Sequence, residues 1–254
     1  MNALDRRQRI LEWLRLKRRV TVAWLAEQTG ASQETIRRDL AGLASEGLVE
    51  KFHGGAAIPG NPAYENAFAT RMYEQVEAKT AVAETAAALF APGDSLFVDT
   101  GTTTLLFARA LAGQRGLTVI TNCVRIAQAL GESENRVFLI GGEYEPDAQE
   151  AVGTFAQDQI ARFNAAHVVI TAGALDVGGV MDFSLAEADV ARAMIAQANT
   201  VTVLADASKL GRRALFKVMP LARIDRLVVD AEPDAELREA LDEAGVALYI
   251  AGAA

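Results

Sequence analysis

The sequence predicts a small helical domain at the N-terminus, followed by a larger α/β domain whose sheet is mainly parallel. Three short helical patterns and a hairpin fill the first 58 residues, and after residue 95 apolar, β-branched runs alternate with Ala- and Leu-rich helical sequence. The chain has 254 residues, 51% of them apolar, with 20 Gly, 6 Pro and 1 Cys. These values exclude a disordered, collagen-like or disulfide-rich protein.

Charge is distributed unevenly along the chain. Residues 1–60 contain ten Lys and Arg against seven Asp and Glu, a net charge of +3. Because the net charge of the whole chain is −8, residues 61–254 carry −11. A DNA-binding module joined to an unrelated acidic domain has this distribution, because phosphate contacts need only local cations. Chance clustering of solvated arginines is the alternative, and three charges do not decide between the two.

The N-terminal helical patterns have the spacing of a helix-turn-helix. Residues 5–17 carry the first apolar face and residues 22–29 the second, which ends at Gly30. A third helix is expected to begin after Ser32 as its N-cap. The turn between the second and third helices is then only a few residues long. The predicted buried positions of the third helix are Ile36, Leu40 and Leu43.

The outward face of the third helix carries side chains suited to DNA. Gln33 and Thr35 lie near its N-terminus, where a recognition helix meets base edges, and the two arginines that follow can reach phosphate or guanine. Residues 48–56 are predicted to form a short hairpin, the wing of a winged helix. A three-helix interaction module is the alternative. The predicted DNA-binding residues are Ser32, Gln33, Thr35, Arg37, Arg38, Lys51 and His53.

A Pro and Gly cluster at residues 58–62 marks the predicted domain boundary, because each Pro removes a backbone donor. The predicted organisation is a DNA-binding domain at 1–58, a linker at 59–72 and a second domain at 73–254, with helical sequence over 64–90 that breaks near Val76. Strands are expected at residues 95–99, 117–121, 137–140, 167–171, 200–205, 224–230 and 246–250. Runs buried on both faces indicate a largely parallel sheet covered by helices, such as those expected at 105–112 and 186–198.

The end of the first of these strands is the strongest candidate ligand site. In open α/β sheets ligands bind at the carboxyl ends of the strands. A Gly that permits close approach, three hydroxyls and a helix N-terminus make an anion cradle. An ordinary turn with one Thr as N-cap is the alternative, but it does not account for three Thr in a row. The predicted site residues in this loop are Asp99, Thr100, Gly101, Thr102, Thr103 and Thr104.

The other strand ends are also polar or rich in Gly, which predicts one shared pocket. Lys209 offers a cation for phosphate, while carboxylates and an amide offer partners for sugar or polyol hydroxyls. A solvated surface pair is the alternative for Asp206 and Lys209. Cys123 is expected to be a small buried residue at a helix start rather than a reactive thiol. The further predicted effector-binding residues are Asn122, Gly141, Gly142, Glu187, Asp206 and Lys209.

The N-terminal motifs resemble those of the DeoR family of bacterial transcriptional regulators. The residues that carry the resemblance are 35–40 (TIRRDL), 46–48 (EGL) and 53–56 (HGGA), in this order. The resemblance implies a winged helix-turn-helix whose third helix enters the major groove. It places Arg37 and Arg38 at basic positions of the family. Asp39 is expected to be structural and to orient a neighbouring Arg, because phosphate would repel an acid that faces it.

The second domain resembles the effector domain of the same regulators. The matching segments are 98–104 (VDTGTTT), 119–122 (VITN), 141–142 with Gly153, 187–188 and 204–212 (LADASKLGR). The resemblance implies a fold like that of ribose-5-phosphate isomerase and a sensor of phosphorylated sugars. Glu145 stands where the family often has Arg, which removes a possible phosphate contact, and Cys123 stands where it often has Ser. Residues 180–183 (VMDF) are similar to a segment of glycerol-3-phosphate repressors.

The leading functional hypothesis is a repressor that binds operator DNA as a homo-oligomer, a dimer or tetramer, and is controlled by a phosphorylated sugar or polyol. The rival is a sugar-phosphate isomerase that uses Asp206, Lys209 or Glu187 in acid/base chemistry; a domain that only mediates assembly is a third possibility. With two His and no metal-spaced cluster, no cofactor or metal is expected. The absence of a signal-like N-terminus, of a membrane-length apolar run and of paired Cys predicts a cytoplasmic protein without a membrane partner.

Overall fold

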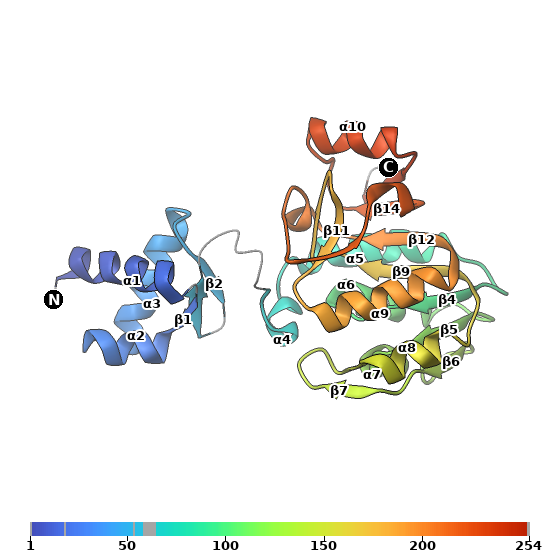
Figure 1. The fold of residues 1–254 in the computed structure, drawn as a ribbon, viewed down its shortest axis with the longest axis horizontal. Helices are drawn as coiled ribbons and strands as arrows, with labels where there is room; N and C mark the ends of the chain where they lie inside the picture. Colours follow the sequence, from blue (N-terminus) through green and yellow to red (C-terminus); the bar gives the residue numbers. More distant parts are fainter. Residues whose placement is uncertain (1, 18, 53, 58–64, 253–254) are drawn as a thin grey trace. The chain divides into compact units, whose positions relative to one another are not determined.

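The computed structural model describes residues 2–17, 19–52, 54–57 and 65–252, and the chain divides into two compact units, residues 1–66 and 67–254. In the first unit, three helices pack together beside a small antiparallel sheet (Figure 1). The sequence does not predict β1, because three residues are too few to show strand alternation. The elements are α1 (Ala3–Lys17), β1 (Arg19–Thr21), α2 (Val22–Thr29), α3 (Gln33–Ser45), β2 (Glu50–Phe52) and β3 (Gly55–Ala57), with the strands in the order β1-β3-β2.

The turn between α2 and α3 is set by two local signals. Gly30 has a φ of 67°, in the left-handed region, and ends α2. The Oγ of Ser32 accepts a hydrogen bond from the N–H of Thr35 at 3.2 Å, which confirms Ser32 as the N-cap of α3. The core of the unit confirms the predicted buried face of α3; its largest side chains are Ile10, Leu14, Leu25, Ile36 and Leu40.

Asp39 ties α3 to α1. Its side chain is almost completely buried, and it accepts hydrogen bonds from Arg6 Nε at 2.5 Å and from Arg7 Nε at 3.3 Å. Gly42, one turn further along α3, leaves room for the same arginine, since a Cβ there would lie 2.6 Å from a guanidinium nitrogen of Arg7. The expectation that Asp39 is structural is therefore confirmed, and its partners are arginines of another helix.

The second unit is built on one seven-stranded sheet in which every neighbouring pair of strands is parallel. All seven predicted strands are confirmed within a few residues. The predicted fold class of an α/β domain with a mainly parallel sheet is likewise confirmed. In spatial order the strands are β15 (Ala247–Ile250), β14 (Arg226–Val229), β12 (Ala198–Leu204), β9 (Ala165–Thr171), β4 (Ser95–Val98), β5 (Thr118–Thr121) and β6 (Arg136–Leu139).

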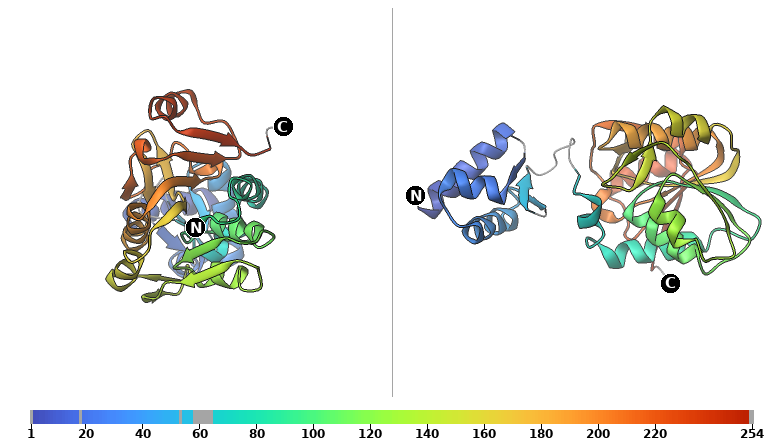
Figure 2. Two further views of the ribbon diagram at one scale, coloured as in Figure 1. Left: turned by 90° about the vertical axis from the view of Figure 1, so that its right-hand side faces the viewer. Right: turned by 90° about the horizontal axis from the view of Figure 1, so that it is seen from below.

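Helices cover both faces of this sheet. Phe97 points into a core that contains side chains of α8, α9 and α10, whereas its neighbours Leu96 and Val98 point into a second core with α5, α6 and α7. Figure 2, in the view from below, shows α8 and α9 on one side of the strands and α5 and α6 on the other. The helices are α4 (Phe68–Arg71), α5 (Val76–Ala87), α6 (Thr102–Leu111), α7 (Val124–Ala129), α8 (Thr154–Ile160), α9 (Leu185–Ala196) and α10 (Ala235–Glu243).

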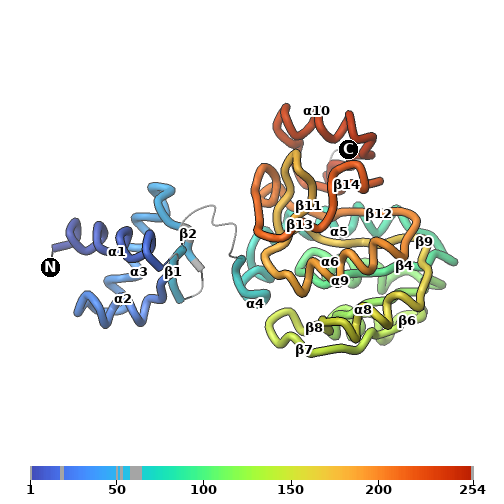
Figure 3. Tube along the Cα trace, viewed as in Figure 1, coloured from blue at the N-terminus to red at the C-terminus, as the bar shows by residue number. Residues whose placement is uncertain are grey.

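Shorter elements surround the carboxyl ends of the strands (Figure 3). The sequence predicts neither of the small antiparallel sheets, whose strands are only three or four residues long. One sheet contains β10 (Ala174–Asp176), β11 (Gly179–Asp182) and β13 (Phe216–Met219), and the other β7 (Glu143–Glu145) and β8 (Glu150–Val152). Of the two 3-10 turns in the described residues, η1 (Ala207–Lys209) follows the carboxyl end of β12, whereas η2 (Leu221–Arg223) leads into the amino end of β14.

Part of the segment predicted as a linker packs inside the second unit. Residues 59–64 lie outside the described residues, but Phe68 begins α4 and is fully buried in the core on the α5 and α6 side. Its N–H donates a hydrogen bond to Asp147 Oδ2 at 3.2 Å. The predicted break in the helical sequence lies at residues 72–75, immediately before α5. In the described part of the chain, no helix has the length and apolar character needed to cross a membrane.

The order of the strands creates a switch point. From β4 the chain moves outward to β5 and β6, returns to β9 on the other side of β4, and then continues to β12, β14 and β15. The connections that leave β4 and β9 therefore run in opposite directions. The carboxyl ends of the strands at such a switch point are the usual place of ligand sites in open α/β sheets.

Removal of the Asp39 carboxylate should destabilise the first unit. Asp39→Ala removes the buried carboxylate that both Arg6 and Arg7 contact, and we expect a loss of about 1–3 kcal/mol of unfolding free energy. The only two Trp residues of the chain, Trp13 and Trp24, are both in this unit, so Trp fluorescence during urea unfolding of the full-length protein reports on it alone. Glu46→Ala is the control, because Glu46 is an exposed partner of Arg7 at 3.7 Å. Equal losses in both variants would contradict the assigned role of Asp39.

Candidate functional site

The predicted DNA-contacting residues lie at the start and along the exposed face of α3. Arg37 and Arg38 are exposed, and both pair with Glu34, at 3.7 and 3.5 Å. Arg37 also donates to Gln33 Oε1 at 3.3 Å. Exposed pairs of this kind contribute only about 0–1 kcal/mol, so either guanidinium can exchange Glu34 for a phosphate or a base at little cost.

The remaining predicted DNA contacts differ in placement. The Ser32 and Thr35 hydroxyls lie 2.9 Å apart, so their polar groups already cap the helix. Lys51 is exposed on β2, the first strand of the hairpin. His53 lies outside the described residues.

In the second unit, Gly101 allows the loop after β4 to pack against the end of β9. A Cβ on Gly101 would lie 2.6 Å from Cγ2 of Thr171, so a larger residue fits only if the loop or the Thr171 side chain shifts. The Asp99 N–H donates to Val169 O at 3.0 Å, and the Thr104 hydroxyl donates to Gly101 O at 3.2 Å. The loop that leads into α6 is therefore packed against β9 and largely buried, as are its residues Asp99, Thr100, Thr102, Thr103 and Thr104.

Asn122 and Glu150 meet at the end of β5. Both side chains are fully buried, and Asn122 Nδ2 donates to Glu150 Oε2 at 2.7 Å and to Ala151 O at 3.0 Å. Four buried oxygens of this region have no hydrogen-bond partner among the described residues. They are Asp99 Oδ1, Thr100 Oγ1, Asn122 Oδ1 and Glu150 Oε1. Unsatisfied buried polar atoms are costly, so this group of oxygens is suited to a ligand that supplies hydrogen-bond donors.

Burial and like charge raise the pKa values of two carboxyl groups of this region. Burial, together with the nearby Asp182, raises the pKa of Asp99 to about 7. Burial, with the charges of Glu187 and Asp99, raises the pKa of Glu150 to about 10. Glu187 lies half-buried in the first turn of α9, where its N–H donates to Ser184 Oγ at 3.4 Å. The acidic groups from β4, β8, β11 and α9 thus act on one another electrostatically.

Positive charge lies at the same edge of the sheet, beyond the end of β12. Lys79 of α5 is buried, and its Nζ donates to Arg71 O at 2.7 Å. Burial lowers the pKa of Lys79, the nearby Asp206 raises it, and Lys209 lowers it further, so the three groups act on one another electrostatically. Asp206 is buried and accepts a hydrogen bond from the Ser208 N–H at 3.1 Å, while Lys209 is half-buried on η1.

Gly141 and Gly142 differ from the other predicted site residues. Gln159 binds both polar backbone groups of Gly141, accepting from its N–H at 3.2 Å and donating to its carbonyl at 2.9 Å. Gly142 lies against β8, where an added Cβ would be 2.6 Å from Val152 O. The structure thus gives both glycines packing contacts with β8 and α8 and does not bring them into the buried polar group at β4 and β5.

Sequence reasoning did not name Glu150, Lys79 or Asp182 as site residues, although Lys79, with Phe68 and Arg71, resembles a family position. Glu150 follows an exposed acidic loop, and its burial depends on the pairing of β8 with β7 and on the approach of Asn122, which leave no local signal. Asp182 appears in the sequence only within the segment similar to glycerol-3-phosphate repressors. For Lys79 a signal exists, since it stands among buried Ala and Val positions of an amphipathic helix.

Cys123 is buried at the N-cap of α7, with its Sγ 3.9 Å from Ala148 O. Its burial at the helix start is as expected from the sequence, and burial raises the pKa of the thiol, which disfavours the reactive thiolate. Across the described residues, no group of three or more His, Cys, Asp and Glu side chains is arranged to hold a metal ion.

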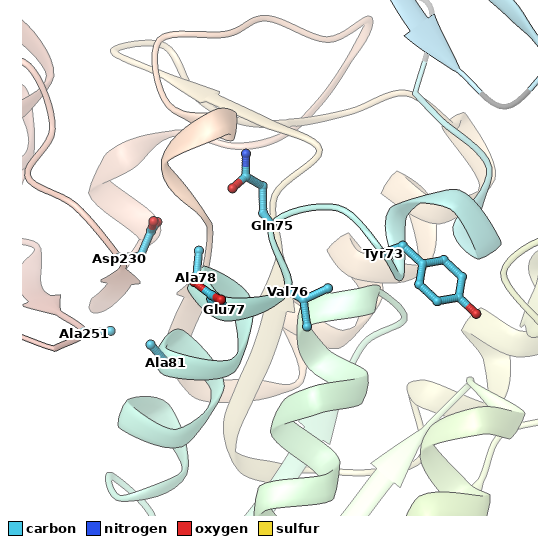
Figure 4. Close-up of a pocket in the computed structure, with 8 residues that line it drawn as sticks. All are labelled: Tyr73, Gln75, Val76, Glu77, Ala78, Ala81, Asp230 and Ala251. Carbon is cyan, nitrogen blue, oxygen red and sulfur yellow. The ribbon is translucent and has the colours of Figure 1, made fainter.

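A pocket of about 610 Å³ is lined by residues at the start of α5 and at the ends of β14 and β15. Figure 4 shows Asp230 and Ala251 at the ends of β14 and β15, and Gln75 to Ala78 at the start of α5. Asp230 Oδ1 accepts a hydrogen bond from the Ala207 N–H at 2.6 Å, which connects this pocket to the turn that carries Lys209. The buried oxygens at β4 and β5 do not line it.

Comparison with known proteins agrees with the two-unit organisation. A model of the DeoR-like helix-turn-helix domain matches residues 6–61, and a model of the DeoR C terminal sensor domain matches residues 74–231. Among solved structures, ribose 5-phosphate isomerase A from Methanocaldococcus jannaschii is similar over 54% of this chain and 55% of that chain, with a TM-score of 0.42 and 17% identity.

Curated relatives match almost the whole chain. The HTH-type transcriptional regulator GlpR of Haloferax volcanii is 34% identical over 243 residues, 95% of each protein. The glycerol-3-phosphate regulon repressor of Escherichia coli is 30% identical over 252 residues, 98% of this chain and 100% of the relative. Because both units match their family models and full-length relatives match throughout, this chain belongs to the DeoR family of transcriptional regulators.

Proposed function

We propose that the protein represses a sugar or polyol catabolic operon and that a phosphorylated sugar or polyol controls its binding to operator DNA. In this proposal residues 1–58 bind DNA, and the second unit binds the effector and forms the homo-oligomer. The linker predicted at 59–72 ends before Phe68, which packs in the core of the second unit. The family assignment and the names of the relatives, which include a glycerol-3-phosphate regulon repressor, support this role. The protein needs no cofactor for it, and it acts in the cytoplasm, where the operator lies.

The DNA side of the proposal rests on α3. Its exposed Gln33, Arg37 and Arg38 are presented from a helix whose first turn is capped by Ser32, the geometry of a recognition helix. One small unit provides too few base contacts for useful specificity, so two units on adjacent half-sites are expected. A homo-oligomer supplies them. Lys51 on the hairpin, with His53, would add contacts to the backbone or minor groove.

The proposed effector site is supported by the arrangement of polar groups at one edge of the sheet. Buried oxygens without a hydrogen-bond partner lie at the switch point, and lysines lie at the same edge. In the proposed arrangement Lys79 and Lys209 bind the phosphate, and Asp99, Asn122 and Glu150 bind the hydroxyls. Because its pKa is raised to about 10, Glu150 brings little negative charge to an anionic ligand at neutral pH, and the raised pKa of Asp99, about 7, reduces the charge of that carboxyl group.

Control of DNA binding would follow from a shift between conformations. An effector that binds one arrangement of the oligomer more tightly increases its population, and DNA binding falls if the two recognition helices no longer match their half-sites in it. Acid/base residues at strand ends are also compatible with an isomerase, but the relatives are named as regulators, and the proposal is a regulator without turnover.

Arg37→Ala should abolish operator binding at physiological salt while leaving effector binding intact, because a bidentate contact to guanine contributes about 1–3 kcal/mol and each half-site loses one. Fluorescence anisotropy with a duplex that the wild-type protein selects from a random library measures this. Arg162→Ala removes the same charge from the second unit and should retain operator affinity. An Arg37→Ala protein with wild-type operator affinity would refute the assigned recognition helix.

Lys209→Ala should lose the stabilisation that the effector provides. The measurement is a thermal-shift panel of phosphorylated sugars and polyols that includes glycerol-3-phosphate. The effector in this panel should raise the melting temperature of the wild-type protein, because a ligand bound only to the folded state stabilises it. Lys217→Ala, which changes an exposed Lys of β13, should keep the shift. Measurable turnover of ribose-5-phosphate, abolished by Lys209→Ala, would instead favour the isomerase.

Glu150→Gln should flatten the pH dependence of stability. The pKa of Glu150 rises from 4.5 to about 10 on folding, so between these values the folded chain holds an extra proton and the unfolding free energy falls as pH rises. Removing one such proton changes the slope by up to about 1.4 kcal/mol per pH unit. Urea unfolding followed by circular dichroism at pH 5, 7 and 9 measures it. Exposed Glu132→Gln is the control, and an unchanged slope in Glu150→Gln would show that Glu150 ionises normally.

A further inference from the structure

A second pocket, of about 460 Å³, lies between α6 and α7. Its volume is within the usual range for small-molecule sites. The polar side chains that line it all carry N–H donors, and no carboxylate is among its lining residues. The lining residues are Leu105 and Arg109 of α6, Arg125, Gln128 and Ala129 of α7, and Gln149 of the loop before β8.

Arg125 is held in place but lacks an anionic partner. Its guanidinium carbon lies 4.7 Å from the centre of the Phe68 ring, and its Nε is buried without a hydrogen-bond acceptor. Phe68 is itself fixed, being fully buried, with its N–H bound to Asp147. Within the described residues neither Arg125 nor Arg109 forms an ion pair. A partly buried guanidinium with an unused donor favours an oxyanion, which accepts two N–H bonds from the planar group.

Several residues that line this pocket are close in sequence to residues of the proposed effector site. Leu105 follows Thr104, Arg125 follows the Asn122 turn, and Gln149 precedes Glu150. Backbone hydrogen bonds join these segments, from the Val124 N–H to Gln149 O at 2.9 Å and from the Ala151 N–H to Asn122 O at 2.8 Å. The backbone of Gln149 is also constrained, because its φ of 57° is one that residues other than Gly rarely adopt.

We propose that this pocket is a second anion site, separate from the proposed effector site, and that it binds a small phosphate-bearing metabolite. Arg125 and Arg109 bind the phosphate oxygens, and the amides of Gln128 and Gln149 donate to the remaining ones. None of the residues assigned to the effector lines this pocket, so the two sites can be tested independently.

Calorimetric titration of the full-length protein with inorganic pyrophosphate tests the proposal. The wild-type protein should bind saturably, and Arg125→Gln and Arg109→Gln should each weaken binding at least about tenfold, because each removes charge-assisted hydrogen bonds. Arg136→Gln is the matched control, since Arg136 stacks on Phe138 at 4.6 Å but lies on β6, away from the pocket. Lys209→Ala should retain this binding, whatever its effect on sugar phosphates.

Three results would overturn the second site. Absence of saturable pyrophosphate binding would do so, as would equal weakening in Arg136→Gln, which would indicate a general charge effect. If Lys209→Ala loses pyrophosphate binding while Arg125→Gln and Arg109→Gln retain it, the anion binds at the effector site instead. If Arg125→Gln does not fold because Phe68 loses its partner, exposed Arg109→Gln decides the question by itself.

Discussion

The packing of the loop after β4 against the end of β9 determines how the candidate ligand site of the second unit is built. Gly101 of this loop lies against Thr171, and a Cβ at Gly101 would overlap the Thr171 side chain. The loop, which begins with Asp99, is therefore buried against β9 instead of extending into solvent. The same packing deprives several polar atoms of water. The chain thus accepts a destabilising group of buried oxygens at the place where a ligand can satisfy them.

Two chemically different sets of polar groups lie along this edge of the sheet. On one side of β9, the ends of β4 and β5 gather carboxyl, hydroxyl and amide groups, and raised pKa values keep part of this group neutral. On the other side, the end of β12 brings Asp206 and Lys209 to the buried Lys79. A ligand that carries hydroxyls at one end and a phosphate at the other matches this distribution better than one that is uniformly anionic or uniformly neutral.

The sequence predicts the features that depend on local pattern. Each strand of the large sheet is an apolar, β-branched run, and Ser32 and Gly30 define the turn before α3 by their own chemistry. What it does not predict depends on distant contacts. Glu150 resembles a solvated acid until β8 brings it against Asn122, and Gly141 resembles a ligand cradle until Gln159 binds its backbone. Strands of three residues, such as β1, are too short for periodicity to show.

The attachment of α3 to α1 through Asp39 has a consequence for how such a regulator can change its target. The tilt of α3 is fixed partly by Arg6 and Arg7, which belong to a helix outside the helix-turn-helix. An exchange at either arginine can reorient every side chain that α3 presents without altering any of them. Related proteins with an identical recognition helix can therefore prefer different operators. The amino-acid sequence of α3 alone is an incomplete guide to the DNA sequence that is bound.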